Sequence, residues 1–223
     1  EDPSGLVRYT AAELLGEMER PSVIPVLKNA ALDQRNASFV MGGMSVREMA
    51  IGALAGCGPE AVPVLLELRS NDAIGTPNKL LCISALARTG NDDTALPELL
   101  KIIKTGTPSE VSSAVRGLGG GFHKYSPDSQ AAIMDVIRPA LSHPTRHVRE
   151  AACSAVLFIG DPGLIPLLEP LLQDPHKEIT EELDETMTKY VTVEIYPVRK
   201  RAEMAIKELQ RIAERQAKVA LPK

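Results

Sequence analysis

The stretch at residues 46–68, VREMAIGALAGCGPEAVPVLLEL, decides the fold of this chain. Apolar residues recur at three- and four-residue steps from Val46 to Cys57, so they share one face of a helix. Gly58 and Pro59 then break this helix, because glycine tolerates positive φ and proline favours the first turn of a new helix. A second apolar helical pattern continues to Leu68. The stretch therefore predicts two helices joined by a tight turn.

The Val-Arg-x-x-Ala motif that opens this stretch recurs along the chain. Intact copies occupy residues 7–11, 46–50, 148–152 and 198–202, and degenerate copies begin at Asn78 and Glu110. The starts at residues 7, 46, 78, 110, 148 and 198 are separated by 39, 32, 32, 38 and 50 residues. A shared period with occasional insertions is typical of stacked helical repeats. We therefore predict an all-α fold of about six stacked helical hairpins that forms one domain over residues 1–223.

Further positions recur at fixed distances from the motif. A leucine or valine follows each clear start by eight residues, at Leu54, Leu86 and Val156. A glycine stands four residues later, at Gly58, Gly90 and Gly160, and a second-helix proline returns at Pro25, Pro63, Pro97 and Pro166. Pro63 lies beyond the first turn of its expected helix, so we expect it to bend that helix.

Together these motifs resemble the short HEAT-like repeats named after phycobilisome lyases, and the resemblance covers nearly the whole chain. It implies a right-handed α-solenoid, in which antiparallel helix pairs stack into a curved rod with the second helices on the concave side. It also implies that each motif Arg pairs with an Asp at the end of the preceding repeat. The pairs that fit are Asp33–Arg47 and Asp174–Arg199. Ser142 stands at the corresponding position before Arg149, so no such pair is expected there.

Composition limits the classes of partner. The formal charge is −4, from 25 basic and 29 acidic residues, and only 3% of residues are aromatic, with no Trp. This balance favours neither nucleic acid nor an anionic membrane as a partner. No apolar run approaches the length of about 20 residues that spans a bilayer.

The three cysteines, Cys57, Cys82 and Cys153, lie among Ala and Leu and show no Cys-x-x-Cys spacing. We therefore expect buried thiols rather than a disulfide or metal site. Unpaired thiols favour a cytoplasmic location. Because the chain begins at Glu1 without Met, an exported mature chain and a fragment of a larger protein stay open as alternatives.

Three insertions, near residues 33–45, 119–127 and 176–197, account for the uneven spacing. They hold five of the seven aromatic residues: Phe39, Phe122, Tyr125, Tyr190 and Tyr196. Loops on a rigid scaffold often carry recognition, and aromatic side chains supply contact area at low entropic cost. We therefore predict that these aromatics contact a partner. The alternative is that each long loop folds back and needs one bulky anchor.

The third insertion contains the one strand-like pattern in the chain. Val191, Val193 and Ile195 alternate with polar or aromatic residues over 190–196, whereas the preceding acidic stretch 178–185 (EITEELDE) favours a helix. A strand in a solenoid has no neighbour within the repeats, so it must pair with another insertion, a second chain or a bound peptide. We interpret the segment as an interaction edge.

No pattern of catalytic or cofactor-binding residues is present. The run 119–124 (GGGFHK) lacks the spacing of a phosphate-binding loop, and we expect a flexible turn there. His143 and His147 are separated by Pro144 and have no third ligand nearby, so no metal is expected. The resemblance extends to di-iron hydroxylases with His-Glu dipeptides and to DNA glycosylases with a basic, Trp-containing groove; this chain has neither feature. We predict no enzymatic activity and no cofactor.

The two ends of the array differ. The first repeat starts near residue 6, so no N-terminal cap is expected, whereas the helix from Val198 to about Gln216 has one apolar and one charged face, as a C-terminal cap requires. Oligomerisation is expected, if it occurs, through the uncapped first repeat or the 190–196 segment.

We predict a scaffold that binds a protein or peptide along the concave second-helix face, helped by the inserted loops. Equivalent exposed positions along that face are Lys28, Glu67, Lys101, Arg138 and Glu169. Because these side chains include both basic and acidic groups, they do not indicate a ligand of one particular charge. The alternative, suggested by the family name, is an accessory or chaperone-like subunit of a lyase or another modifying enzyme.

Overall fold

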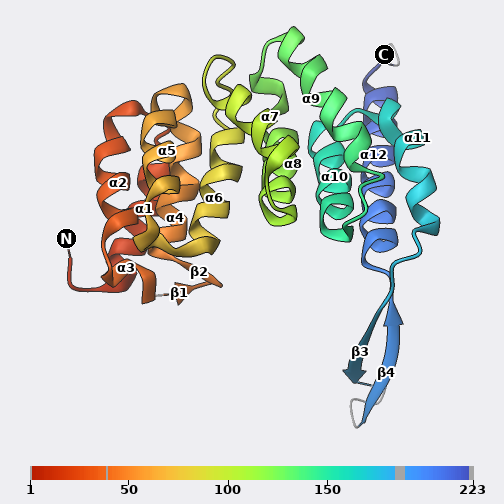
Figure 1. Cartoon of the computed structure of the whole chain (residues 1–223), viewed down its shortest axis with the longest axis horizontal. Coiled ribbons are helices and arrows are strands. Elements are labelled where there is room, and N and C mark those ends of the chain that lie inside the picture. Colours follow the sequence, from red (N-terminus) through yellow and green to blue (C-terminus); the bar gives the residue numbers. More distant parts are fainter. Residues whose placement is uncertain (1, 39, 184–188, 221–223) are drawn as a thin grey trace.

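The helices stack in chain order into a solenoid (Figure 1). The computed structural model describes residues 2–38, 40–183 and 189–220. The first helices of successive hairpins are α1 (Gly5–Glu17), α4 (Val46–Leu54), α6 (Gly75–Ala87), α8 (Pro108–Gly121), α10 (Arg146–Ile159) and α12 (Pro197–Ala220). The second helices are α2 (Ile24–Leu32), α5 (Val62–Ser70), α7 (Ala95–Thr105), α9 (Pro127–Ala140) and α11 (Ile165–Leu168). The predicted α-solenoid is therefore confirmed.

The stretch at 46–68 forms the expected hairpin. Ser45 caps α4, because its side chain accepts a hydrogen bond from the amide of Glu48 while the Glu48 carboxylate accepts one from the Ser45 amide. A 3₁₀ turn (Ala55–Ala61) joins α4 to α5, and Gly58 within it has a φ of 76°. The expectation that no apolar run approaches membrane-spanning length is wrong, because Val46–Ser70 is long and apolar enough by length and composition alone. In this fold the stretch is divided by Gly58 into two helices.

Positive φ marks the hairpin turn in several repeats. Gly58, Gly90 and Gly160, which recur in the sequence, have φ values of 76°, 70° and 72°. The corresponding position of the first repeat, twelve residues after Val7, is Glu19, and its φ of 47° is also positive. The turn geometry therefore holds even where the sequence supplies no glycine, and Glu19 adopts a conformation that costs a side chain about 1–2 kcal/mol.

The prediction that Pro63 bends its helix is wrong. Helix α5 starts at Val62, so Pro63 occupies the first turn, where the missing amide hydrogen would have no intrahelical partner. Pro25 and Pro166 lie at the same place in α2 and α11. In each case a 3₁₀ turn precedes the helix, and this delays the α-helical start to the residue before the proline.

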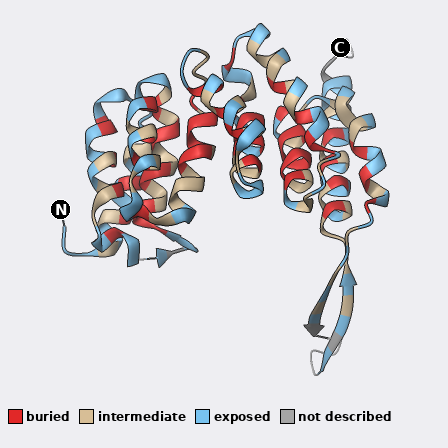
Figure 2. Ribbon diagram, in the orientation of Figure 1, coloured by how far each residue is buried: buried red, intermediate tan, exposed pale blue. Residues whose placement is uncertain are grey.

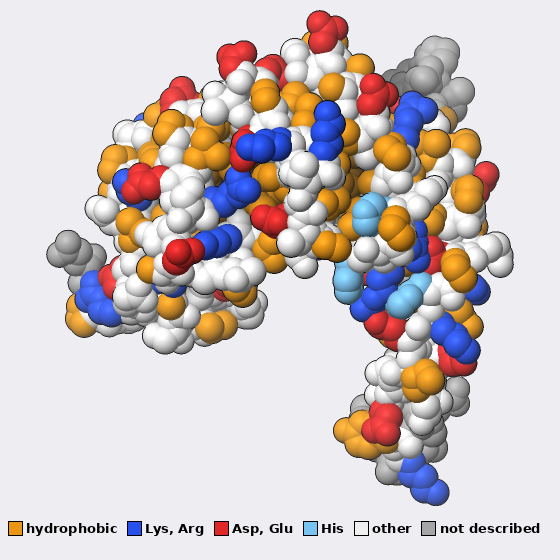
Figure 3. Space-filling view, in the orientation of Figure 1, with side chains coloured by type: hydrophobic (Ala, Val, Ile, Leu, Met, Phe, Trp, Pro, Cys, Tyr) orange, Lys and Arg blue, Asp and Glu red, His pale blue; other side chains and the backbone are white. Residues whose placement is uncertain are grey.

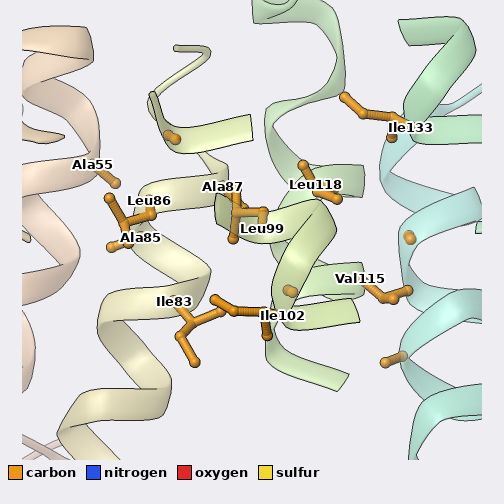
Figure 4. Packing of buried hydrophobic residues seen from close by; sticks show 14 of the residues in the cluster. Ala55, Ile83, Ala85, Leu86, Ala87, Leu99, Ile102, Val115, Leu118 and Ile133 are labelled. Atoms are coloured by element: carbon orange, nitrogen blue, oxygen red, sulfur yellow. The ribbon is translucent and has the colours of Figure 1, made fainter. Parts of the chain in front are cut away.

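One hydrophobic core runs through the stack from α2 to α12. Buried residues form stripes on the facing sides of neighbouring helices (Figure 2). Between α6 and α7 the contacts are aliphatic, with Ile83 beside Ile102 and Ala87 beside Leu99, whereas Leu86 points to the other side of α6, toward Ala55 (Figure 4). The core thus needs no aromatic residues at its centre, as the composition indicates.

The three cysteines are buried in this core, as expected. Burial raises the pKa of the Cys82 and Cys153 thiols to about 12, because the thiolate loses its hydration. These thiols are therefore protonated at neutral pH and pack as small apolar side chains.

The prediction of a flexible turn at Gly119–Gly121 is wrong, because these glycines end helix α8. A Cβ on Gly119 would lie 2.3 Å from the Cα of Ala155 in α10, and one on Gly121 would lie 2.3 Å from the carbonyl oxygen of Ala87 in α6. On the same side as Gly121, a Cβ on Gly117 would lie 2.6 Å from the Cβ of Ala87. Helix α8 therefore approaches both neighbours so closely that only hydrogen fits at these positions.

The first and third insertions form small β-hairpins. The first contains the short helix α3 (Arg35–Ser38) and the strands β1 (Val40–Met41) and β2 (Met44–Ser45). The third contains β3 (Glu178–Leu183), antiparallel to β4 (Tyr190–Ile195), in the register Glu178↔Ile195 to Leu183↔Tyr190. The strand prediction for 190–196 is confirmed for Tyr190–Ile195, but its partner is the preceding segment of the same insertion and not another insertion, a second chain or a bound peptide. The helical tendency assigned to 178–185 is wrong for Glu178–Leu183, because β4 offers this acidic segment a complete ladder of backbone hydrogen bonds.

The stack is bent into an arch, and both β-hairpins project on its hollow side (Figure 1). Helices of both kinds run across the arch, from the hollow side toward the outer side. The expectation that second helices line the concave side is therefore too simple, because connections between repeats border the hollow as well.

The two ends of the solenoid differ as the sequence indicates. Val198, Ala202, Ala205 and Leu209 of α12 are fully buried, so this helix covers the C-terminal end of the described core. At the other end, Leu14 of α1 and Met18, the residue that follows this helix, are about half exposed, at 56% and 47%.

We expect Gly119→Ala and Gly120→Ala to change stability in opposite directions. Gly119→Ala forces α8 and α10 apart and should destabilise the protein by about 1–3 kcal/mol. Gly120 faces outward, and its added Cβ would meet Arg88 Cδ at an ordinary 3.5 Å, so Gly120→Ala should stabilise by about 0.5–1 kcal/mol. Urea unfolding followed by circular dichroism measures both. Equal effects would contradict the close approach.

Glu19→Gly should stabilise the protein by up to about 1 kcal/mol, because glycine relieves the positive φ. The matched substitution is Gly160→Ala, where φ is 72° and the added Cβ has no contact closer than 3.8 Å. That variant should lose about 1 kcal/mol through backbone conformation alone. Thermal unfolding of both variants checks the pair, and a destabilised Glu19→Gly protein would disprove the shared turn geometry.

Candidate partner-binding surface

The charged positions predicted along the second helices lie at the surface, and two of them pair with each other. Lys28 Nζ lies 2.7 Å from Glu67 Oε2, which links α2 to α5. Arg69 and Glu98 form a similar bridge of 3.0 Å between α5 and α7. Lys101, Arg138 and Glu169 are exposed. These ion pairs partly neutralise the charge on the N-terminal half of the second-helix face. Figure 3 shows basic and acidic side chains close to one another on the visible face of the molecule.

A groove with a volume of about 840 Å³ lies between α9 and the segment that begins with α11. Its basic and titratable lining consists of Arg138, His143, Arg149, Asp174 and His176. Its other walls are formed by Leu141, Ser142, Pro144, Pro166, Leu167, Pro170, Leu171, Gln173 and Pro175. Figure 3 shows His side chains gathered beside the hollow of the arch, close to where the β3–β4 hairpin leaves the solenoid. The groove therefore adjoins the base of that hairpin.

Asp174 organises the floor of this groove. Its carboxylate accepts hydrogen bonds from Arg149 Nε at 2.6 Å and Arg149 Nη2 at 2.9 Å, and another from the amide of His176. The Asp174 carbonyl accepts a hydrogen bond from Arg199 Nε at 2.7 Å. Burial acts to raise the pKa of Asp174, but the hydrogen bonds from Arg149 and His176 outweigh it and hold the pKa below its usual value.

These contacts correct the pairing that the family resemblance implied. The Asp174 carboxylate binds Arg149 of its own repeat, whereas Arg199 donates a hydrogen bond only to the Asp174 backbone carbonyl. Arg149 Nη1 also donates to the carbonyls of His143 and Pro144, so Arg149 joins the end of one repeat to the end of the next. Sequence order alone assigns each Asp to the following Arg, whereas the stacking brings both arginines to Asp174.

Asp33 does not pair with Arg47 through its carboxylate. Arg47 is buried and donates to the carbonyls of Ala31 and Asp33, while the Asp33 carboxylate binds Arg35. The hydrogen bonds from the Arg35 side chain and amide lower the pKa of Asp33 to about 2. The motif arginines are therefore ties between repeats, with carbonyl groups as frequent acceptors.

The aromatics of the second insertion are anchors rather than contact residues. Tyr125 is 4% exposed, and its hydroxyl donates to the Ala87 carbonyl at 2.8 Å. Phe122 is partly buried against the core and lies edge-on to the His123 ring. The predicted partner contact at Tyr125 is therefore wrong, because the side chain is buried and its hydroxyl links the segment after α8 to the end of α6. Phe39 lies outside the described residues.

The aromatics of the third insertion have a different environment. Tyr190 on β4 is 71% exposed, and Ile179 on β3, which points to the same side of the hairpin, is 69% exposed. Tyr196 lies at the hairpin base, where the Arg199 guanidinium stacks at 3.9 Å from its ring centre. The hairpin thus carries exposed apolar groups on an arm that projects from the solenoid (Figure 1).

Sequence inspection missed the groove as a site. The available signal is a concentration of Pro144, Pro166, Pro170 and Pro175 with two histidines around the fifth repeat, but nothing in their order says that they share a surface. Within the residues that the structure describes, no group of three or more His, Cys, Asp or Glu side chains is arranged to hold a metal ion.

Comparison with protein families agrees with the fold. Residues 112–184 match the family model described as HEAT repeats, and residues 7–33 match that of the PBS lyase HEAT-like repeat. A search of curated proteins gave no significant match.

Several solved structures are similar to this chain. Human deoxyhypusine hydroxylase in complex with glycerol is 18% identical, with a TM-score of 0.41, over 95% of this chain and 82% of that one. A designed armadillo repeat protein is 15% identical, with a TM-score of 0.39, over 94% and 96%. A designed armadillo repeat protein in complex with the peptide (KR)4 is 14% identical, with a TM-score of 0.40, over 90% and 92%.

We expect Asp174→Asn to destabilise the protein by about 2–4 kcal/mol, because it leaves the mostly buried Arg149 guanidinium without its counter-charge. The control is Asp33→Asn, which removes a pair with the exposed Arg35 and should cost far less. Denaturant unfolding of both variants near pH 7 measures the difference.

The same pair predicts a pH dependence. The folded pKa of Asp174 is lowered, so its contribution is complete above the unfolded value of about 3.9 and is lost as the pH falls through the folded pKa. The stability difference between wild type and Asp174→Asn should therefore shrink at acid pH. A difference that stays constant down to the acid unfolding limit would contradict this assignment.

Proposed function

We propose that this chain, which is a HEAT-like repeat protein, is a non-enzymatic scaffold that binds a protein or peptide partner. The partner occupies the second-helix face near the groove between α9 and α11 and contacts the β3–β4 hairpin beside it. The solenoid supplies a rigid support, and the insertions supply the contact groups.

The hairpin is the observation that carries the proposal. A two-stranded hairpin without other support is only marginally stable in water, so a projecting one gains stability from whatever covers it. Its exposed Ile179 and Tyr190 offer apolar area to such a partner. Both outer strand edges also keep backbone groups that are not used in the β3–β4 ladder.

The groove is the second contact. It is open, and its floor is held by the Asp174–Arg149 pair, so little ordering is needed when a partner binds. Among the five positions predicted on the second-helix face, Arg138 lines this groove. We therefore assign Arg138, Tyr190 and Ile179 as contact residues. Lys101 and Glu169 remain candidate contacts on the same face, while Lys28 and Glu67 already bind each other.

Selection from a random-peptide display library against the wild-type chain tests this function. We expect enriched peptides whose affinity falls at least about tenfold in the double variant Ile179→Ser/Tyr190→Ser, because the apolar contact is lost. Phe158→Ser is the matched control, since Phe158 is also exposed, at 53%, but lies on α10. Affinity is measured by fluorescence anisotropy and folding by circular dichroism. Peptides that bind the double variant and wild type equally would refute the role of the hairpin.

A further inference from the structure

The groove between α9 and α11 is lined by Arg138, His143, Arg149 and His176 and by a single carboxylate, that of Asp174. Arg149 and Asp174 neutralise each other, which leaves Arg138, His143 and His176 as the side chains able to receive an anionic group. Within the described part of the chain, Arg138 has no ion pair. The groove therefore carries a positive side chain whose counter-ion the protein does not provide.

The two histidines also direct a donor toward a ligand. His143 Nδ1 accepts a hydrogen bond from the Thr145 amide at 3.0 Å, so the neutral ring carries its hydrogen on Nε2. His176 Nε2 is buried and has no hydrogen-bond partner. Its nearest acid is Glu178, whose carboxylate lies 3.9 Å away and is bound by Arg146. His143 Nε2 can therefore donate to a carboxylate oxygen, and the His176 side chain, which is 35% exposed, also lines the groove.

Helix α10 begins beside the groove, and its first basic residue, Arg146, is already paired with two carboxylates. Its first turn contains Arg146, His147 and Arg149 but no acid, and the Thr145 side chain does not cap it. The N-terminus of a 14-residue helix carries a partial positive charge, which acidic residues normally offset. Here that offset comes from Glu150 and Glu178, through their pairs with Arg146.

The apolar walls limit the shape of the ligand. Pro144, Pro166, Pro170 and Pro175 have no amide hydrogen, so they offer rigid apolar surface and no backbone donors. Between them lie Leu141, Leu167 and Leu171. An open groove of this kind fits the aliphatic part of an extended chain, while the charged ends of its side chains reach Arg138 and the histidines.

We infer that the groove between α9 and α11 selects an acidic extended peptide segment, whose carboxylates bind Arg138, His143 and His176. This inference rests on the proposed scaffold function and specifies the partner's chemistry. In the N-terminal part of the second-helix face, Lys28 and Arg69 are paired with Glu67 and Glu98, so these side chains discriminate less between acidic and basic partners.

Fluorescein-labelled hexaglutamate and hexalysine are the probes, and anisotropy near pH 7 is the measurement. We expect hexaglutamate to bind the full chain and hexalysine not to bind. Arg138→Glu should weaken hexaglutamate binding by about tenfold or more, because it reverses the charge in the groove. His143→Gln/His176→Gln should weaken it by a smaller factor, since Gln keeps a donor but cannot become charged.

Arg116→Glu is the matched control, because Arg116 is also exposed but lies on α8, outside the groove. It should leave hexaglutamate binding unchanged. Equal binding of the two probes, or equal weakening by Arg116→Glu and Arg138→Glu, would overturn the inference. Display-selected peptides that compete for the groove but lack acidic residues would also overturn it while leaving the scaffold function intact. Failure to recover any binding peptide would count against both.

Discussion

The close approach of first helices is the constraint on which the rest of the structure depends. Seven residues after each later motif start stands a small residue, at Ala53, Ala85, Gly117, Ala155 and Ala205. Gly16 against Ala53 and Gly119 against Ala155 leave no space for an added methyl group at the glycine. Since interiors pack at crystal-like density, this spacing limits which side chains can stand at each crossing. The first repeat has Leu14 at this position, and there the helix face is exposed.

A scaffold held this tightly leaves the insertions as the variable part of the molecule. The segment after α8 is drawn back to the core by Tyr125, whose hydroxyl binds the Ala87 carbonyl. The third insertion leaves the core as the β3–β4 hairpin, with Tyr190 exposed. Two loops with similar aromatic content thus have opposite environments. The difference arises because Tyr125 has a buried acceptor within reach, whereas Tyr190 lies far along a strand that projects outward.

Local patterns predicted much of the fold but little of the candidate site. The periodic leucines, the turn glycines Gly58, Gly90 and Gly160 and the strand at 190–195 depend on neighbours in sequence, and the structure contains them. The groove depends on residues from two repeats, and its lining mixes Arg138 with His176. The partner of Asp174 was missed for the same reason. Arg149 precedes Asp174 by 25 residues and Arg199 follows it by 25, so only the stacking of the repeats distinguishes the two arginines.

The sequence by itself determined the repeat, the hairpin turns, the buried cysteines and the apolar face of α12, because each follows from the period of a single helix or turn. Only the tertiary structure decided that Gly119–Gly121 continue a helix, that Glu178–Leu183 become a strand and that the Asp174 carboxylate binds Arg149. Each of these outcomes is set by an element from another part of the chain. A glycine run, an acidic segment and a carboxylate have several local options, and packing against a neighbour selects one of them.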